Sequence, residues 1–171
     1  MQPCRLVILG IASLTLTIYC AQLKAGDWPW FLGPQHTGVS TETGLLPVWP
    51  ESGPPIVWRR DIGTGYSAPS VLGDRLVLHH RPADEEVVEC LDVNTGDSIW
   101  TYSYPSQFKD PYGYNNGPRC SPVLTADYCY TLGAEGRLSC LTLTDGQLVW
   151  EHKLRDEFQI PDGFFGVGCS P

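Results

Sequence analysis

Two neighbouring histidines, His79 and His80, are the residues of this 171-residue chain whose type is best suited to bind a metal ion. Adjacent side chains on a strand point to opposite faces, so without a bulge the two cannot reach one ion. We therefore expect both to be structural or to face solvent. The acidic residues that follow surround an expected hairpin loop and predict a solvated turn: Asp84, Glu85, Glu86 and Glu89.

Other motifs of catalytic or cofactor sites are weak or missing in the sequence. No CxxC, CxxCH or HExxH pattern occurs, which removes the strongest zinc, haem and redox-motif interpretations. The segment GFFGVG, residues 163–168, lacks the spacing of a dinucleotide-binding loop and a following helix. We assign no catalytic residue and no metal ligand from the sequence.

One long connection between expected strands carries groups suited to ligand binding. It reads PSQFKDPYGYNNGPRCSP, residues 105–122, and we expect it on the ligand-binding face, because loops on rigid scaffolds often carry function. Its stacking, amide and cationic groups are Tyr112, Tyr114, Asn115, Asn116 and Arg119. The alternative is a simple turn at Asn-Asn-Gly-Pro, with Arg119 paired to a neighbouring acid.

A repeat of about 50 residues must position this loop. The segment CLDVNTGDSIW, residues 90–100, returns as CLTLTDGQLVW, residues 140–150. Each unit holds four short segments rich in Val, Leu, Ile and aromatic residues, separated by turn residues, which indicates four strands. Four-stranded units at this period are typical of β-propeller blades, and a β-sandwich with two similar hairpins is the alternative.

We therefore predict an all-β fold, a β-propeller fragment of four-stranded antiparallel blades with about two full blades plus a closing strand and the start of a third. The incomplete repeats cover residues 56–171, in units at about 56–104, 105–154 and 155–171. A closed propeller has four or more blades, so we expect a fragment or partner chains that cover its edges. Residues 26–55 are expected to form an irregular lead-in that packs through its aromatic rings: Trp28, Trp30, Phe31 and Trp49.

Residues 1–25 have the signature of a secretory signal peptide, with a positive charge, an apolar run and small residues before a cleavage point near Ala25. The apolar run of about 15 residues is shorter than the roughly 20 that a membrane span needs. A bulky Tyr19 disfavours a lipoprotein site at Cys20. We expect export to the periplasm or another extracytoplasmic site, with no transmembrane anchor after cleavage.

The chain is acidic, and its acidity limits its partners. The formal charge is −8, and it becomes −10 when a leader carrying Arg5 and Lys24 is removed. Nucleic acids and anionic membranes both need clustered Lys and Arg, so we exclude them as partners. Five cysteines would remain after cleavage, an odd number that leaves at least one unpaired. Cys90 and Cys140 hold equivalent positions, and we expect both to pack as small apolar residues.

The repeated segment resembles the tryptophan-docking motif of the pyrroloquinoline-quinone (PQQ) dehydrogenase repeat: a small residue, x, Asp, x, x, Thr, Gly, x, x, x, Trp. The residues that carry this resemblance, or hold an equivalent position in their unit, are Cys90, Asp92, Thr95, Gly96, Trp100, Cys140, Asp145, Gly146, Trp150 and Trp58. The resemblance extends over residues 56–171, and the lead-in is similar to that of exported quinoprotein-like propeller proteins common in planctomycete-type bacteria. We expect the glycines to form turns with positive φ, and the tryptophans to reach across to a neighbouring blade.

The resemblance implies either a scaffold or an enzyme. Quinoprotein dehydrogenases hold PQQ with calcium, a catalytic aspartate and, in many, two adjacent cysteines; this sequence has no Cys-Cys pair. A fold alone does not give a function. We expect an exported binding or interaction scaffold without catalysis in this chain, whose partner is a protein or other exported ligand, further blades or another chain. The alternative is part of a PQQ-dependent alcohol or sugar oxidoreductase, with PQQ and calcium held by residues outside this chain.

Overall fold

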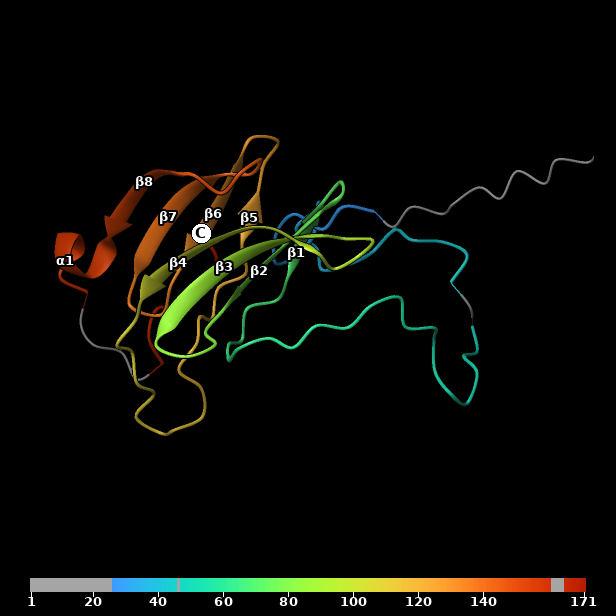
Figure 1. Cartoon of the computed structure of the whole chain (residues 1–171), viewed down its shortest axis with the longest axis horizontal. Helices are drawn as coiled ribbons and strands as arrows, with labels where there is room; N and C mark the ends of the chain where they lie inside the picture. Colours follow the sequence, from blue (N-terminus) through green and yellow to red (C-terminus); the bar gives the residue numbers. More distant parts are fainter. Residues whose placement is uncertain (1–25, 46, 161–164) are drawn as a thin grey trace, which may run out of the picture.

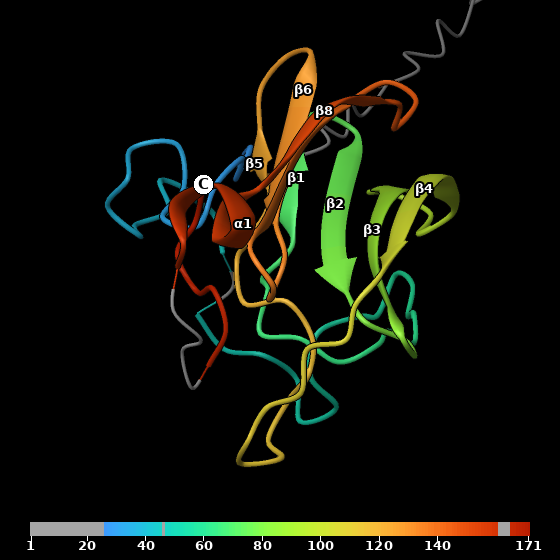
Figure 2. The ribbon, with the colours of Figure 1, turned by 90° about the vertical axis from the view of Figure 1, so that its left-hand side faces the viewer.

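The computed structural model of the chain describes residues 26–45, 47–160 and 165–171, so the predicted signal peptide lies outside the described residues. Two four-stranded antiparallel sheets stand side by side, with the inner strands β1 and β5 close together (Figure 1, Figure 2). The first sheet is built from β1 (Ser70–Leu72), β2 (Arg75–His80), β3 (Glu85–Asp92) and β4 (Ser98–Pro105). The second is built from β5 (Val123–Leu124), β6 (Tyr128–Leu132), β7 (Arg137–Thr142) and β8 (Leu148–Lys153).

Each sheet is a meander in which every strand pairs with the next strand in sequence. The two sheets also share a fine detail: the register of the third and fourth strands shifts between Cys90 and Leu91, and again between Cys140 and Leu141. These positions are equivalent in the repeat, so the repeated sequence gives a repeated irregularity. The prediction of an all-β fold with two four-stranded antiparallel blades is confirmed.

The main apolar core lies between the two sheets, because the strands turn alternate side chains toward it. It combines residues of both sheets: Val77, Val88, Cys90, Trp100, Leu124, Cys129, Leu141 and Leu143. All five cysteines of the described residues are free thiols, and burial raises the pKa of Cys90 to about 11. A thiol with a raised pKa stays protonated and unreactive near neutral pH, as a packing residue should.

In the described residues, the segments that flank the two blades form no further sheet. Residues 56–62, expected as a closing strand, make no ladder pairs, since the described residues offer no further strand of that blade beside them. After β8 comes one turn of helix, α1 (Leu154–Phe158), where we expected the third unit to start. Five residues are too few to show helical periodicity in a sequence, which is why the helix was not predicted.

The first residues of the lead-in join the inner edges of the two sheets. Trp28 and Val71 exchange backbone hydrogen bonds of 2.8 and 2.9 Å, and the Leu124 N–H donates to the Pro29 carbonyl at 2.8 Å. Beyond these residues the lead-in runs away from the sheets before it returns to β1 (Figure 1). The lead-in therefore connects the two blades mainly through its backbone.

The aromatic side chains of the lead-in differ in their exposure to solvent and in their contacts. Trp30 stacks on His36, with 5.0 Å between ring centroids. Phe31 and Trp49 are 60% and 51% exposed, so the prediction that they pack is wrong. Phe31 lies in a surface turn, and Trp49 lies in the segment that leaves the sheets. Nowhere in the described residues is there a helix with the length and hydrophobicity that a bilayer crossing requires.

Candidate functional site

The connection from β4 to β5, residues 106–122, is held in place by a buried arginine of the β2–β3 turn. Arg81 donates to the carbonyl oxygens of Ser106 and Phe108, both at 2.7 Å, and to that of Asn116 at 3.1 Å. Only 6% of Arg81 is exposed, so these bonds lie away from solvent. Hydrogen bonds to a charged group are stronger than neutral ones, and one side chain thus fixes both halves of the loop.

A second set of contacts closes the loop around a buried acid. The Asp110 carboxylate accepts the backbone N–H groups of Tyr112 at 2.9 Å and Asn115 at 3.1 Å. The guanidinium of Arg119 lies 3.6 Å from the same carboxylate, and the Asn116 side-chain oxygen accepts the Asp110 N–H at 2.8 Å. The loop is therefore ordered from within, and Arg119 is paired with a neighbouring acid.

The remaining polar groups of the expected ligand-binding residues also serve the loop. Arg119 donates to the Asn115 carbonyl at 2.8 Å, and its guanidinium lies 4.6 Å from the ring centroid of Phe108. The Asn115 amide donates to the Gly65 carbonyl at 3.2 Å. Asn115 and Arg119 thus use hydrogen-bonding groups in contacts within the protein. Tyr112, Tyr114 and Asn116 are the exposed members of the predicted set, and the two tyrosines are its large aromatic side chains.

Three exposed rings form what we call the aromatic surface: Tyr112, Tyr114 and Phe165. They are 56%, 74% and 59% exposed. Tyr112 stacks on both other rings, with centroid distances of 6.1 Å to Tyr114 and 6.0 Å to Phe165. Phe165 comes from the segment after α1, so residues about 50 positions apart build one surface. Exposed rings in contact with one another are typical of a binding surface.

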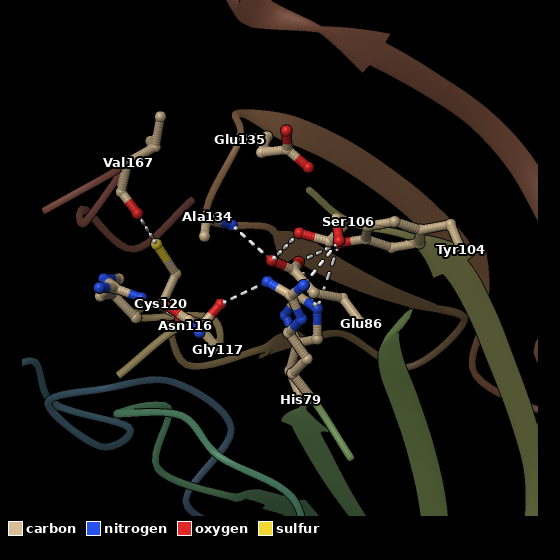
Figure 3. A network of polar contacts seen from close by, with 12 residues as sticks. His79, Glu86, Tyr104, Ser106, Asn116, Gly117, Cys120, Ala134, Glu135 and Val167 are labelled. Atoms are coloured by element: carbon tan, nitrogen blue, oxygen red, sulfur yellow. Dashed lines mark hydrogen bonds and ion pairs between the residues drawn. The ribbon is translucent and has the colours of Figure 1, made fainter. Parts of the chain in front are cut away.

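A buried polar network connects the two blades beside this loop (Figure 3). The Tyr104 hydroxyl donates to Glu86 Oε2 at 2.7 Å, and His79 Nε2 lies 3.3 Å from the same oxygen. The other oxygen, Oε1, accepts the Ala134 N–H of the β6–β7 turn in the second blade at 3.0 Å. Burial raises the pKa of Glu86, but the hydrogen bond and charge of His79, helped by Tyr104 and Ala134, outweigh it and hold that pKa below its ordinary value.

The expected solvated turn is wrong for Glu86 and Glu89, which are only 1% and 5% exposed. The reason is that each carboxylate meets a partner from elsewhere in the chain. Glu89 is ion-paired with Arg60, and His80 Nε2 lies 3.8 Å from it. His79 and His80 therefore contact different carboxylates, as expected for neighbours on a strand, and both are structural.

The repeated tryptophans and glycines lie against one another across repeats. A Cβ placed on Gly146 would lie 2.5 Å from the Trp100 ring, and one on Gly96 would lie 2.7 Å from the Trp58 ring. The Trp100 indole N–H donates to the Leu143 carbonyl at 3.0 Å, and the Trp58 indole N–H donates to the Val93 carbonyl at 2.9 Å. Each tryptophan thus rests on the turn of the following repeat.

The other residues of the motif shape these turns. Asp92 Oδ1 accepts the N–H groups of Asn94 at 2.8 Å and Thr95 at 3.1 Å. In the second unit Asp145 accepts from the Thr142 hydroxyl instead. The small residue of each motif lies opposite the tryptophan of its own blade, since Cys90 pairs with Trp100 and Cys140 with Trp150. Trp150 is 38% exposed, in contrast to Trp100.

A family model described as outer membrane protein assembly factor BamB matches residues 33–162 of the chain. The chain belongs to the BamB family. This confirms the expected membership of the PQQ-type repeat proteins. No curated protein matches the sequence of this BamB-family chain.

The BamB-family chain is also similar to three solved structures. BamB from Moraxella catarrhalis is 19% identical with a TM-score of 0.42, over 57% of this chain and 26% of that one. Quinohemoprotein alcohol dehydrogenase from Comamonas testosteroni is 22% identical, with a TM-score of 0.44, over 66% and 16%. A europium-containing methanol dehydrogenase is 15% identical, with a TM-score of 0.40, over 54% and 16%. The chain spans less than a third of each of these proteins.

The described residues do not fit a PQQ–calcium site of the dehydrogenase type. Among them, no group of three or more His, Cys, Asp or Glu side chains is arranged to hold a metal ion. The carboxylates nearest the loop, Glu86 and Asp110, are occupied by the hydrogen bonds described above. We therefore derive no chemical step through PQQ for this BamB-family chain.

Sequence reasoning missed three residues that build the site: Arg81, Asp110 and Phe165. Arg81 follows a strand directly and has no motif around it. Asp110 precedes a proline in the loop and could have been suggested as a turn acceptor, because Asp side chains bond to backbone N–H groups two residues on. Phe165 gives no local signal, since its contact with Tyr112 depends on the fold.

Gly146→Ala tests the contact between the repeated glycine and tryptophan. We expect it to lower the free energy of unfolding by about 2 to 3 kcal/mol, because the new Cβ meets the Trp100 ring and the residue has a φ of +71°. Gly73→Ala is the matched control, since Gly73 also has positive φ, +61°, but open space around a Cβ. It should cost about 1 kcal/mol from backbone strain alone. Equal losses in urea denaturation would show that the ring contact has no energetic role.

Proposed function

We propose that this BamB-family chain is an exported binding scaffold that holds a polypeptide partner on its aromatic surface, without catalysis in this chain. The observation that carries the proposal is the stack of three exposed rings, formed by Tyr112 and Tyr114 of a loop ordered by Arg81 and Asp110 and by Phe165 of the segment after α1. Aromatic residues are enriched at protein interfaces and supply most of their binding energy.

The fixed backbone and the exposed tyrosine rings of the loop support a polypeptide as the ligand. Arg81 and Asp110 fix its backbone, so binding costs little ordering of the loop. The polar groups of Asn115 and Arg119 are used inside the loop, and the large apolar side chains that the loop exposes are its two tyrosine rings. Apolar and aromatic side chains of a protein match such a surface better than a small polar substrate does.

Two further points support a scaffold. The family is described as an outer membrane protein assembly factor, a role that depends on binding other proteins. Export is supported by the signal-peptide signature of residues 1–25, which would place the surface outside the cytoplasm.

Binding of an unfolded polypeptide tests the proposal. The probe is fluorescently labelled α-lactalbumin that has been reduced and carboxymethylated, and its anisotropy reports binding. We expect wild type to bind it and Tyr112→Ser/Tyr114→Ser to bind at least about tenfold more weakly. The control is Tyr128→Ser, because Tyr128 is a partly exposed tyrosine on β6, outside the loop. Equal binding by the double variant, or no binding by wild type, would contradict the proposal.

A further inference from the structure

A polar cavity of about 240 Å³ lies between the end of β4 and the second sheet. Three basic and two acidic side chains line it: Arg137, Lys153, Arg155, Glu135 and Asp156. The whole chain has 11 Lys and Arg against 19 Asp and Glu, so a site with more basic than acidic side chains runs against its composition. Glu151, just outside the lining, is ion-paired with Arg137 and offsets its charge.

The strand register concentrates this positive charge. Arg137 of β7 lies directly opposite Lys153 of β8, and like charges in that position are destabilising. Arg137 has a partner, because Glu151 lies 2.6 Å from its guanidinium, and the same guanidinium lies 4.6 Å from the ring centroid of Tyr104. Lys153 is exposed, and within the described part of the chain its ammonium makes no ion pair. A bound anion would relieve this repulsion.

The cavity lies next to the loop that carries the aromatic surface. The carboxylate of Glu135, on its rim, accepts the Gln107 N–H at the start of the loop at 2.9 Å. The neighbouring residue Ala134 accepts the Val167 N–H at 2.9 Å, two residues beyond Phe165 of the aromatic surface. The β6–β7 turn therefore contacts both the loop and the segment of Phe165, and a single bound chain could reach the rings and the cavity.

We infer that this cavity binds one carboxylate group of the polypeptide partner, an inference that rests on the proposed function. The Lys153 ammonium offers one positive charge to one carboxylate, and the Arg137 guanidinium opposite it, which bonds to Glu151 through one nitrogen, has further N–H groups to donate. The volume of about 240 Å³ is smaller than the roughly 300 to 1,000 Å³ of cavities that hold drug-sized ligands, and it suits a chain end or an acidic side chain. A free small carboxylate has the same chemistry, so the test separates the two sources.

The first test uses N-acetylglycine, which has the carboxylate of a chain end, and N-acetylglycinamide, its neutral counterpart. In NMR titrations the acid should shift the backbone amide signals of Arg137, Lys153 and Arg155 saturably, and the amide should not. Lys153→Glu should raise the dissociation constant for the acid at least about tenfold, because it replaces attraction by repulsion. Lys109→Glu, on an exposed loop residue outside the cavity lining, should leave it unchanged. Equal shifts with the amide, or equal affinity of Lys153→Glu, would overturn the inference.

The second test separates the carboxylate site from the proposed scaffold function. The probe is the peptide acetyl-Phe-Ala-Phe-Ala-Gly, as free acid and as amide. If the cavity binds a carboxylate of a polypeptide, the acid form of the peptide should bind at least about tenfold more tightly than N-acetylglycine. Tyr112→Ser/Tyr114→Ser should then remove this gain in affinity. If the acid form of the peptide binds no more tightly than N-acetylglycine, the cavity is a site for a free small carboxylate. That result would overturn the inference that the carboxylate belongs to a polypeptide. Tight binding that the tyrosine variant leaves unchanged would instead contradict the aromatic surface and leave the carboxylate site standing.

Discussion

Trp100→Ala is expected to lower the free energy of unfolding by about 3 to 5 kcal/mol, the usual cost of removing a buried tryptophan. Trp100 is only 8% exposed and belongs to the core between the two sheets. Its indole N–H donates to the Leu143 carbonyl at 3.0 Å, so the substitution also leaves that carbonyl without its donor. The loss comes from the contact between blades as well as from the ring itself.

Trp150→Ala is the matched control, because Trp150 holds the same position in the second repeat but is 38% exposed. We expect it to cost about 1 to 1.5 kcal/mol, since less apolar area is lost from burial. Urea denaturation followed by circular dichroism measures both variants. Similar losses for the two tryptophans would mean that contact with a following repeat adds nothing to the stability.

Glu86→Gln is expected to cost about 3 kcal/mol at pH 7, the upper end of the range for losing a hydrogen bond to a charged group. The Glu86 carboxylate accepts from Tyr104 at 2.7 Å and from the Ala134 N–H at 3.0 Å. A glutamine amide has one acceptor oxygen, so it cannot accept both bonds on different atoms. Glu85→Gln is the control, since Glu85 is the exposed neighbour on the same strand, and it should change stability by less than about 0.5 kcal/mol.

The cost of Glu86→Gln should also depend on pH, in a direction fixed by the pKa of Glu86. That pKa is lowered in the folded protein, chiefly because the contacts with His79 outweigh the effect of burial. The folded state therefore binds its proton more weakly than the unfolded state does. The stability from Glu86 is complete above the unfolded pKa, about 4.3, and is lost as the pH falls through the folded value. The difference between wild type and variant should thus shrink as the pH falls into the acid range; a difference that grows in acid would contradict the assignment.

The sequence predicted the blades well because the repeat contains the same pattern of strand-forming and turn residues twice. Each strand is a short run of β-forming residues bounded by turn residues, and each turn glycine must take positive φ, as Gly96 and Gly146 do. These sequence patterns each span only a few residues, so they can be recognised without knowing which other parts of the chain pack against them. The second copy of the motif also made chance matches easy to reject.

The rest of the site depends on contacts between residues far apart in the chain, which no local pattern reports. Glu86 and Glu89 lie in an acidic stretch that by composition belongs in solvent, yet Ala134 and Arg60 bring partners to them from 48 and 29 residues away. Of the two roles considered for Arg119, ligand binding and pairing with a neighbouring acid, the structure shows the pairing, with Asp110 inside the loop. The carboxylate cavity shows the same limit, because Arg137 and Lys153 meet only through the β7–β8 register.

The central claim is that the repeated motif joins one blade to the next, through the contact of Trp100 with the turn at Gly146. A double-mutant cycle with Trp100→Leu and Gly146→Ala tests it most directly, through the free energy of unfolding of four proteins. The account predicts that Gly146→Ala costs about 2 to 3 kcal/mol in wild type but only about 1 kcal/mol beside Trp100→Leu, since the ring that its Cβ would meet is gone and only backbone strain remains. Additive costs would contradict the claim, because they would show that Trp100 and Gly146 act independently.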